Sequence, residues 1–169
     1  MIKKACLLIL VFLIVSCNRG LISDQETKLQ KYEAYYQGIL DNEVFIEESK
    51  FFDIEAIMNK VNDDYRYSVI IDHPQVAIYN IEMMVIVDDG SVSINYNTVM
   101  PASGIFDRSY NLVPNQINEA AGFPKGIILD GICYQTKVTL LVMVAWKSED
   151  NLNSYKEFFR LVADINIED

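Results

Sequence analysis

The stretch from Val138 to Trp146 constrains the fold of this 169-residue chain most, because its residues are apolar on both faces of a β-strand. Such a strand has no side that water can cover, so it belongs in the middle of a sheet with protein against each face. The stretch is also too short to cross a membrane as a helix, which takes about 20 residues. The sequence therefore predicts a domain built around a sheet that is buried on both sides.

Other segments predict further strands. Tyr65–Ile71 alternates apolar and polar residues, as a half-buried strand does, and Val76–Val87 is an apolar run long enough to contain a bulge. Asp89-Gly90 is a tight-turn signal that leads into the alternating segment Val92–Thr98, which predicts a hairpin with one wet face. A second hairpin turn is predicted at Asp130-Gly131.

Helical spacing of apolar residues predicts two helices before these strands. The first covers residues 24–40, and Ser23 with Glu26 has the spacing of a capping box at its start. The second is expected over Lys50–Val61, ended by Asn62-Asp63-Asp64.

Helices are also predicted later in the chain. Pro114–Ala121 is expected to be a short helix closed by Gly122, after a long loop over Met100–Val113. A last helix is expected to begin at Ser148 and to carry Leu152, Tyr155, Phe159 and Val162. The predicted fold class is thus α+β: one domain over 24–169, with a mostly antiparallel sheet of about five strands and N-terminal and C-terminal helices packed on it.

The start of the chain indicates where the protein resides. Lys3 and Lys4 precede an uncharged, largely apolar run over Ala5–Ser16, which is typical of a secretory signal rather than a membrane span. Ile14-Val15-Ser16-Cys17 resembles the lipobox of bacterial lipoproteins. This resemblance implies that residues 1–16 are removed as a signal peptide and that Cys17 is acylated and held in a membrane.

The resemblance also implies a location. The protein is expected in the bacterial cell envelope, and Asn18 after the cysteine fits the outer membrane if the organism has two membranes. Residues 17–23 then form the acylated cysteine and a short tether, in which Asn18–Ser23 reach at most ~20 Å. The domain is therefore expected to work close to its membrane.

The charge balance limits the partners. The chain has 14 basic and 24 acidic residues, and losing Lys3 and Lys4 takes its net charge from −10 to −12. Such acidity argues against nucleic acid, whose binding depends on lysine and arginine neutralising phosphates. It permits a cationic protein partner, although acidity also serves solubility alone.

The cysteine and histidine content leaves little for catalysis or metal binding. Cys133 is the one thiol that neither the signal nor acylation removes, and His73 is the sole histidine. These two could form only one thiol–base pair, and their expected roles are structural: a buried strand residue and a turn residue. The acidic pairs Asp63-Asp64 and Asp88-Asp89, and Asp130, coincide with breaks or turns. No catalytic residue, metal ligand or cofactor is predicted.

One polar surface is a candidate binding patch. If the loop after Val92–Thr98 folds over the wet face of that strand, a pocket or contact surface would form from Ser93, Asn95, Asn97, Phe106 and Tyr110. The leading hypothesis is a non-enzymatic envelope lipoprotein that binds a protein partner near the membrane, and its specific version makes that partner cationic. The alternatives are a small-ligand-binding module and, third, a hydrolase of unfamiliar type.

Overall fold

Helix α2, Asp24–Leu40, is the first element of the computed structural model, which describes residues 23–88 and 100–165. Ser23 caps it: the side-chain oxygen accepts a hydrogen bond from the backbone N–H of Glu26 at 3.1 Å. Tyr36 and Ile39 form its buried side. The prediction of a capped helix over these residues is confirmed.

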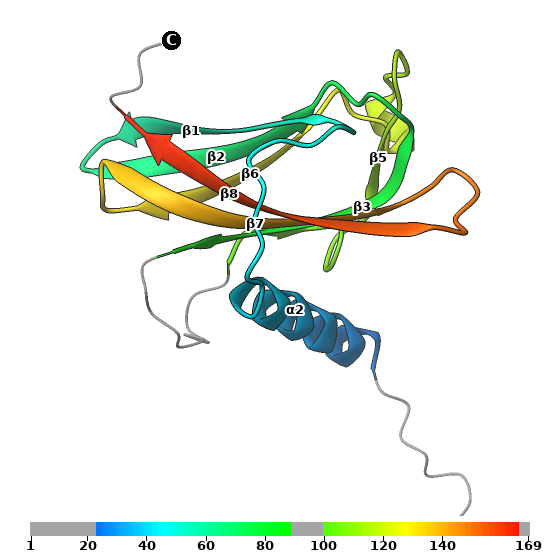
Figure 1. Ribbon diagram of the computed structural model, residues 1–169, viewed down its shortest axis with the longest axis horizontal. Helices are drawn as coiled ribbons and strands as arrows, with labels where there is room; N and C mark the ends of the chain where they lie inside the picture. The colour runs from blue at the N-terminus through cyan, green and yellow to red at the C-terminus, as the bar shows by residue number, and fades with distance from the viewer. Residues whose placement is uncertain (1–22, 89–99, 166–169) are drawn as a thin grey trace, which may run out of the picture.

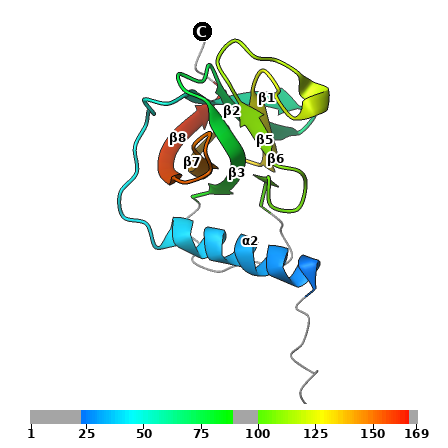
Figure 2. The ribbon, with the colours of Figure 1, turned by 90° about the vertical axis from the view of Figure 1, so that its right-hand side faces the viewer.

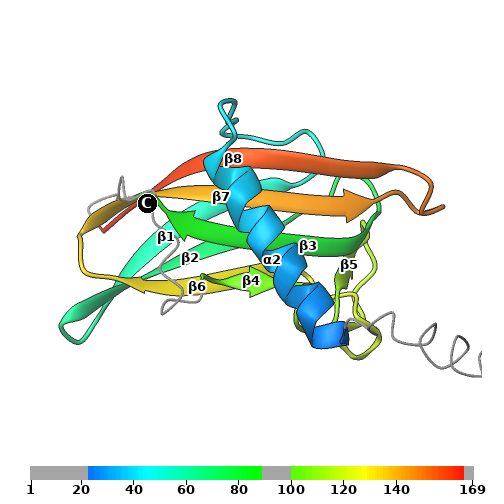
Figure 3. The same cartoon turned by 90° about the horizontal axis from the view of Figure 1, so that it is seen from below.

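The covered sheet, as we call it, lies directly against α2. It is antiparallel, with the order β4-β3-β7-β8 and with β5 also paired to β3. Seen from below, α2 runs obliquely across β3 and β7 (Figure 3). The strands are β3 (Ile78–Val87), β4 (Ala102–Ser103), β5 (Tyr110–Leu112), β7 (Lys137–Lys147) and β8 (Ser154–Asp164).

The prediction for Val138–Trp146 is confirmed, because β7 is a central strand between β3 and β8. The predicted strands over 65–71 and 76–87 are also present, as β2 and β3. The expected bulge in the latter appears as register shifts in the pairing of β3 with β7, between Tyr79 and Glu82.

The open sheet, as we call it, consists of β1 (Asp53–Val61), β2 (Asp64–Asp72) and β6 (Ile127–Cys133) in the antiparallel order β1-β2-β6. Figures 1 and 2 show three layers: α2, then the covered sheet, then the open sheet. No described helix or strand lies over the outer face of the open sheet (Figure 2). The two sheets therefore differ mainly in their outer faces: α2 covers that of the covered sheet, and no described helix or strand covers that of the open sheet.

Two apolar clusters hold the layers together. The larger lies between the sheets and includes Phe52, Tyr67, Val142 and Trp146, and the smaller lies between α2 and the covered sheet. Burying a large apolar side chain stabilises a fold by about 1.5–3 kcal/mol. The buried members of the smaller cluster are Tyr36, Ile39, Met84, Ile86, Ile105, Leu141, Met143 and Ala145.

The predicted helix over Lys50–Val61 is wrong, since these residues contain strand β1. Phe51, Ile54, Ile57, Met58 and Val61 do recur at helical spacing, but the inward residues alternate along a strand. Val61 pairs with Asp64 across a two-residue turn whose first residue has a φ of 59°. That first residue is Asn62, and asparagine tolerates positive φ. The segment expected to end a helix, Asn62-Asp63-Asp64, therefore contains a hairpin turn.

The predicted C-terminal helix is also wrong, because the chain forms β8 instead. Phe159, Leu161 and Ala163 are buried at every second position, which is the period of a strand. Ser148 stabilises the loop before β8 by donating its hydroxyl to Asp150 at 2.5 Å. The complete ladder with β7, from Lys137 to Lys147, buries this apolar face better than an isolated helix could.

Three shorter predictions need correction. Asp130-Gly131 is not a turn but the middle of β6, and the chain bends instead at residues 134–136. The expected long loop over Met100–Val113 contains β4 and β5. The helix expected over Pro114–Ala121 is only a single 3-10 turn at Glu119–Ala121, although Gly122 does close it with a φ of 84°.

The fold is therefore mostly antiparallel sheet, as expected, but with two sheets, eight strands and one long helix in the described part of the chain. Within that part, no helix is both long enough and apolar enough to span a bilayer.

Candidate functional site

The outer face of the open sheet, which we call the open face, is built by alternate residues of β1, β2 and β6. The ladder register places Ile57 beside Ser68 and Asp130. In neighbouring rows, Ile70 lies between Glu55 and Ile128, and Arg66 lies between Asn59 and Ile132. Because side chains alternate across a strand, all of these point away from the core.

Aliphatic side chains are unusually exposed on this face. The exposed fractions are 39% for Ile57, 42% for Val61, 58% for Ile128 and 64% for Ile132, and Tyr134, just after β6, is 84% exposed. Isolated exposed apolar residues need no explanation, but neighbouring ones on one surface mark a contact site. Here they share one sheet face without a described element over them.

Carboxylates surround these aliphatic side chains. Outward positions hold five acidic residues and one arginine, and the Ser68 hydroxyl donates a hydrogen bond to Asp130 at 2.5 Å. The open face thus intersperses exposed aliphatic side chains with charged ones, Asp130 lying between Ile128 and Ile132 on β6, and it has a net negative charge. Its charged residues are Asp53, Glu55, Asp64, Arg66, Asp72 and Asp130.

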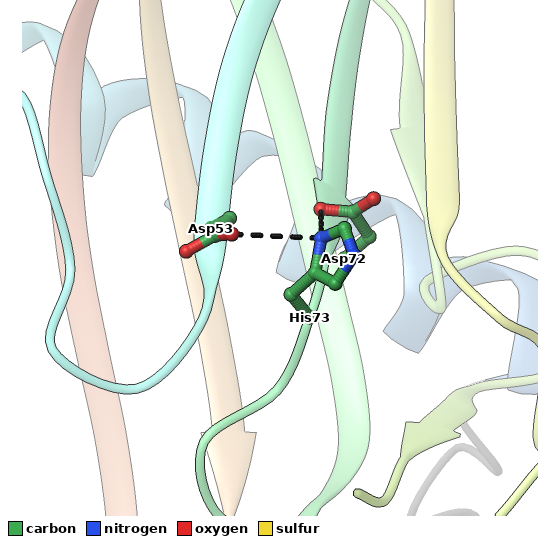
Figure 4. A group of neighbouring side chains, drawn as sticks. All are labelled: Asp53, Asp72 and His73. Atoms are coloured by element: carbon green, nitrogen blue, oxygen red, sulfur yellow. Dashed lines mark ion pairs between the residues drawn. The ribbon is translucent and has the colours of Figure 1, made fainter. Parts of the chain in front are cut away.

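Asp53, Asp72 and His73 form a cluster at one end of the open sheet (Figure 4). Asp53 and Asp72 are directly opposite in the ladder between β1 and β2, where like charges destabilise a sheet. The Nδ1 atom of His73 lies 2.9 Å from Oδ1 of Asp72 and 3.5 Å from Oδ2 of Asp53. The His73 imidazole therefore contacts both carboxylates of this pair.

The same three atoms could hold a divalent cation, since imidazole nitrogen and carboxylate oxygen are ligands of Zn²⁺. Asp53 and His73 are exposed, however, and the contacts within the cluster already account for its geometry. The expectation of no metal site stays a prediction.

A groove lies beside the first three residues of β6, Ile127–Leu129, and we call it the β6 groove. It has a volume of about 400 Å³. One wall is Gly126–Leu129, and the opposite wall comes from β4, β5 and the segment between them. The side chains that shape it include Ser103, Asp107, Arg108, Tyr110 and Glu119.

Two further hollows, each of about 430 Å³, flank His73. One lies beside Gln116 and Lys125, and the other beside Glu48 and Glu55. A small-molecule site is usually an apolar cavity with a few converging polar groups. These hollows mix polar, charged and apolar walls, so they give the ligand-binding hypothesis little support.

Cys133 and His73 lie at opposite ends of the open sheet. Cys133 pairs with Tyr65 at one end, whereas His73 follows Asp72 at the other. The eight-residue step from position 65 to position 73 places Cys133 and His73 roughly 25 Å apart at ~3.3 Å per residue. Burial also raises the pKa of the Cys133 thiol, which lowers its thiolate fraction. The two residues therefore do not form a nucleophile–base pair.

The predicted patch around the Val92–Thr98 strand is only partly described. Ser93, Asn95 and Asn97 lie outside the described residues. Phe106 packs against Tyr32 of α2 at a ring-centroid distance of 5.5 Å. Tyr110 lines the β6 groove, with the Arg108 guanidinium 5.3 Å from its ring centroid. The shared patch of all five residues stays a prediction.

Sequence reasoning missed the open face. The turn predicted at Asp130-Gly131 would put Ile128 and Ile132 on two arms of a hairpin, whereas they are neighbours on one face of β6. The sequence gives little signal for this strand, since Ile127, Ile128 and Leu129 are consecutive apolar residues. The alternation appears only in burial, where Ile127, Leu129 and Cys133 are buried and Ile128 and Ile132 are exposed.

Comparisons with known proteins give no family for this fold. No protein-family model, no curated protein and no solved structure matches the chain.

Proposed function

We propose that the protein is a lipid-anchored bacterial envelope module, not an enzyme, that binds a protein partner through the open face. The observation that carries this proposal is the group of exposed aliphatic side chains on a sheet face that no described element covers. The anchor is Cys17, and the resemblance of residues 14–17 to a lipobox supports it.

The composition of the open face fits a protein interface. Interfaces commonly have an apolar centre that is dehydrated on binding, with a polar rim around it. Ile57, Ile128 and Ile132 supply apolar surface, and the carboxylates at the ends of the sheet, such as Asp53 and Glu55, supply a polar rim. A partner with aliphatic or aromatic residues flanked by lysine or arginine would complement both features.

The position of α2 supports access to this face. The tether leads directly into the start of α2, and α2 lies on the opposite side of the molecule from the open sheet (Figure 1). With Asn18–Ser23 limited to ~20 Å, α2 is the part of the domain closest to the anchor. The open face is then presented to partners rather than to lipid.

The net charge supports a cationic partner. Opposite charges across an interface accelerate association and select among partners, and salt screens them. The affinity is therefore expected to fall as salt rises from about 0.05 to about 0.5 M. Salt-independent binding would leave the apolar surface as the sole determinant.

The test is affinity capture after crosslinking in cells, with two matched double variants. Ile128→Asp/Ile132→Asp changes the open face, and Val44→Asp/Leu152→Asp changes two side chains that are also highly exposed but lie elsewhere. We expect a partner that is lost from the first variant and retained by the second. Equal capture by both variants, or no partner with the unchanged protein, would contradict the proposal.

The anchor requires its own test. Cys17→Ser is expected to abolish incorporation of a labelled fatty acid and to release the protein from membranes. Fatty-acid labelling that persists in this variant would show that Cys17 is not the attachment site.

A further inference from the structure

We propose that the partner, if the function above holds, contributes an extended cationic segment that adds as a strand to the free edge of β6. The segment would lie in the β6 groove, with its backbone hydrogen-bonded to β6. This deepens the proposed function by naming the form and the charge of the bound segment.

The first support is the unprotected edge of β6. A strand edge carries unpaired N–H and C=O groups, and proteins usually protect it by shortness, lysine, proline, a bulge or a covering segment. In the described part of the chain, β6 pairs only with β2, over seven residues and without a bulge. It contains no lysine and no proline.

The other sheet edges in the described part of the chain are protected. β4 has only two residues. The outer side of β8 pairs at its middle with Ile46, whose backbone N–H donates to Phe158 and whose carbonyl accepts from Arg160, both at 3.0 Å, and the strand also carries Lys156. β1 contacts β8 and carries Lys60. An accessible, unprotected edge is therefore specific to β6 among these strands.

The second support is the space beside that edge. A strand that pairs with β6 would lie about 4.8 Å from it, inside the β6 groove. The groove borders β6 at Gly126–Leu129 and faces Ala102 and Ser103. Alternate side chains of an added strand would point either into the groove or outward beside Ile128 and Ile132, which gives both affinity and sequence preference.

The third support is charge. Asp107, Glu119 and Asp130 lie in or beside the groove, against the single cation Arg108 among its lining residues. Arg108 is already engaged, since its Nη2 donates to the backbone carbonyl of Glu119 at 3.2 Å and its guanidinium stacks on Tyr110. Asp107 and Asp130 accept hydrogen bonds, but none of the three carboxylates forms an ion pair with another described residue, so an incoming segment with lysine or arginine can pair with them.

The test uses a synthetic eight-residue peptide of alternating lysine and valine as the probe. A matched control peptide has the same sequence but carries an N-methyl group on every backbone amide, which removes the hydrogen-bond donors from both of its edges and preserves side chains and charge. Amide hydrogen exchange of residues 127–133 is measured by NMR in the free protein and with each peptide.

We expect the lysine–valine peptide to slow exchange at the β6 amides that face away from β2 by at least tenfold, and the N-methylated peptide to leave them unchanged. Asp107→Asn/Asp130→Asn is expected to weaken peptide binding several-fold. Equal effects of the two peptides, or no slowing with either, would overturn strand addition. Edge amides already protected in the free protein would also overturn it, because the protein's own chain would then fill the edge.

These outcomes are separable from those of the proposed function. Loss of partner capture in Ile128→Asp/Ile132→Asp without slowed β6 exchange would support face binding and reject strand addition. If the peptide slows exchange at β6 but Ile128→Asp/Ile132→Asp captures the partner as well as the unchanged protein does, the result would support the edge site and reject the proposed function.

Discussion

Tyr67 and Gly131 are directly opposite each other in the ladder between β2 and β6, and the Tyr67 ring occupies the space where a side chain at position 131 would lie. A Cβ added at Gly131 would be 2.1 Å from both Cζ and Oη of Tyr67. Glycine in the interior of a strand often marks such a close approach. The Tyr67 ring thereby reaches the edge strand and packs β6 onto the core.

Gly131→Ala is expected to destabilise the protein by about 1–3 kcal/mol, because the buried ring must move to avoid the added methyl group. The measurement is urea unfolding, compared with Gly38→Ala in α2. Nothing lies within 4 Å of a Cβ at Gly38, so that variant should be stabilised by about 0.5–1 kcal/mol through helix propensity. A wild-type unfolding midpoint for Gly131→Ala would contradict the observed packing.

The buried hydroxyl of Tyr67 predicts a loss of stability at alkaline pH. Burial raises the pKa of Tyr67 from 10.0 to about 12, with a smaller contribution from Cys133. The unfolded chain ionises first, so the folded state binds more protons between these pKa values and stability falls as pH rises through them. The free energy of unfolding is unaffected by this ionisation below about pH 10. It is lower by about 2–3 kcal/mol at pH values above both pKa values.

Urea unfolding between pH 8 and about 12 measures this loss, and Tyr67→Phe is the matched variant. The variant should show a shallower alkaline decline than the unchanged protein. Identical pH slopes would mean that Tyr67 ionises as easily in the folded state as in the unfolded one.

Glu82 of β3 fixes α2 on the covered sheet. Its carboxylate accepts a hydrogen bond from the Tyr35 hydroxyl at 2.5 Å and forms an ion pair with Lys31. Because a half-buried carboxylate loses a strong partner, Tyr35→Phe should cost about 1.5–3 kcal/mol. Lys31→Met should cost less than about 1 kcal/mol, since the lysine is more exposed than Glu82.

A double-mutant cycle with Glu82→Gln, followed by urea unfolding, checks this assignment. Coupling between positions 35 and 82 should exceed coupling between 31 and 82. Additive effects of Tyr35→Phe and Glu82→Gln would contradict a direct interaction.

Cys133 should react slowly with thiol reagents in the native protein. Its side chain is 7% exposed, its Sγ lies 3.5 Å from the backbone oxygen of Gln135, and burial raises its pKa. Labelling is expected to become at least a hundredfold faster in urea. Equally rapid labelling of the folded protein would restore a reactive thiol, and with it the hydrolase hypothesis.

The sequence predicted the elements whose local signals have one interpretation. The capping box at Ser23 and the doubly apolar Val138–Trp146 stretch both gave correct elements. The segments over 50–61 and 148–162 have apolar residues at helical spacing, but they contain strands β1 and β8, because pairing with neighbouring strands outweighs this local pattern. Ile57, assigned to a buried helix face, points outward from β1 instead.

The candidate site could not be predicted because it depends on register across three strands. Ile57 and Ile128 become parts of one face only through β2, which pairs with both of their strands. Gly131 also misled the prediction, since a glycine after aspartate favours a turn locally, whereas here it accommodates the ring of Tyr67.

Site-specific photocrosslinking in cells tests the central claim most directly. A photoreactive phenylalanine analogue is placed at position 132 on the open face, and at position 29 on the exposed side of α2 as the control. Binding through the open face predicts one dominant crosslinked protein from position 132 and little from position 29. Crosslinking of the same protein from position 29 alone, or from neither position, would contradict the account.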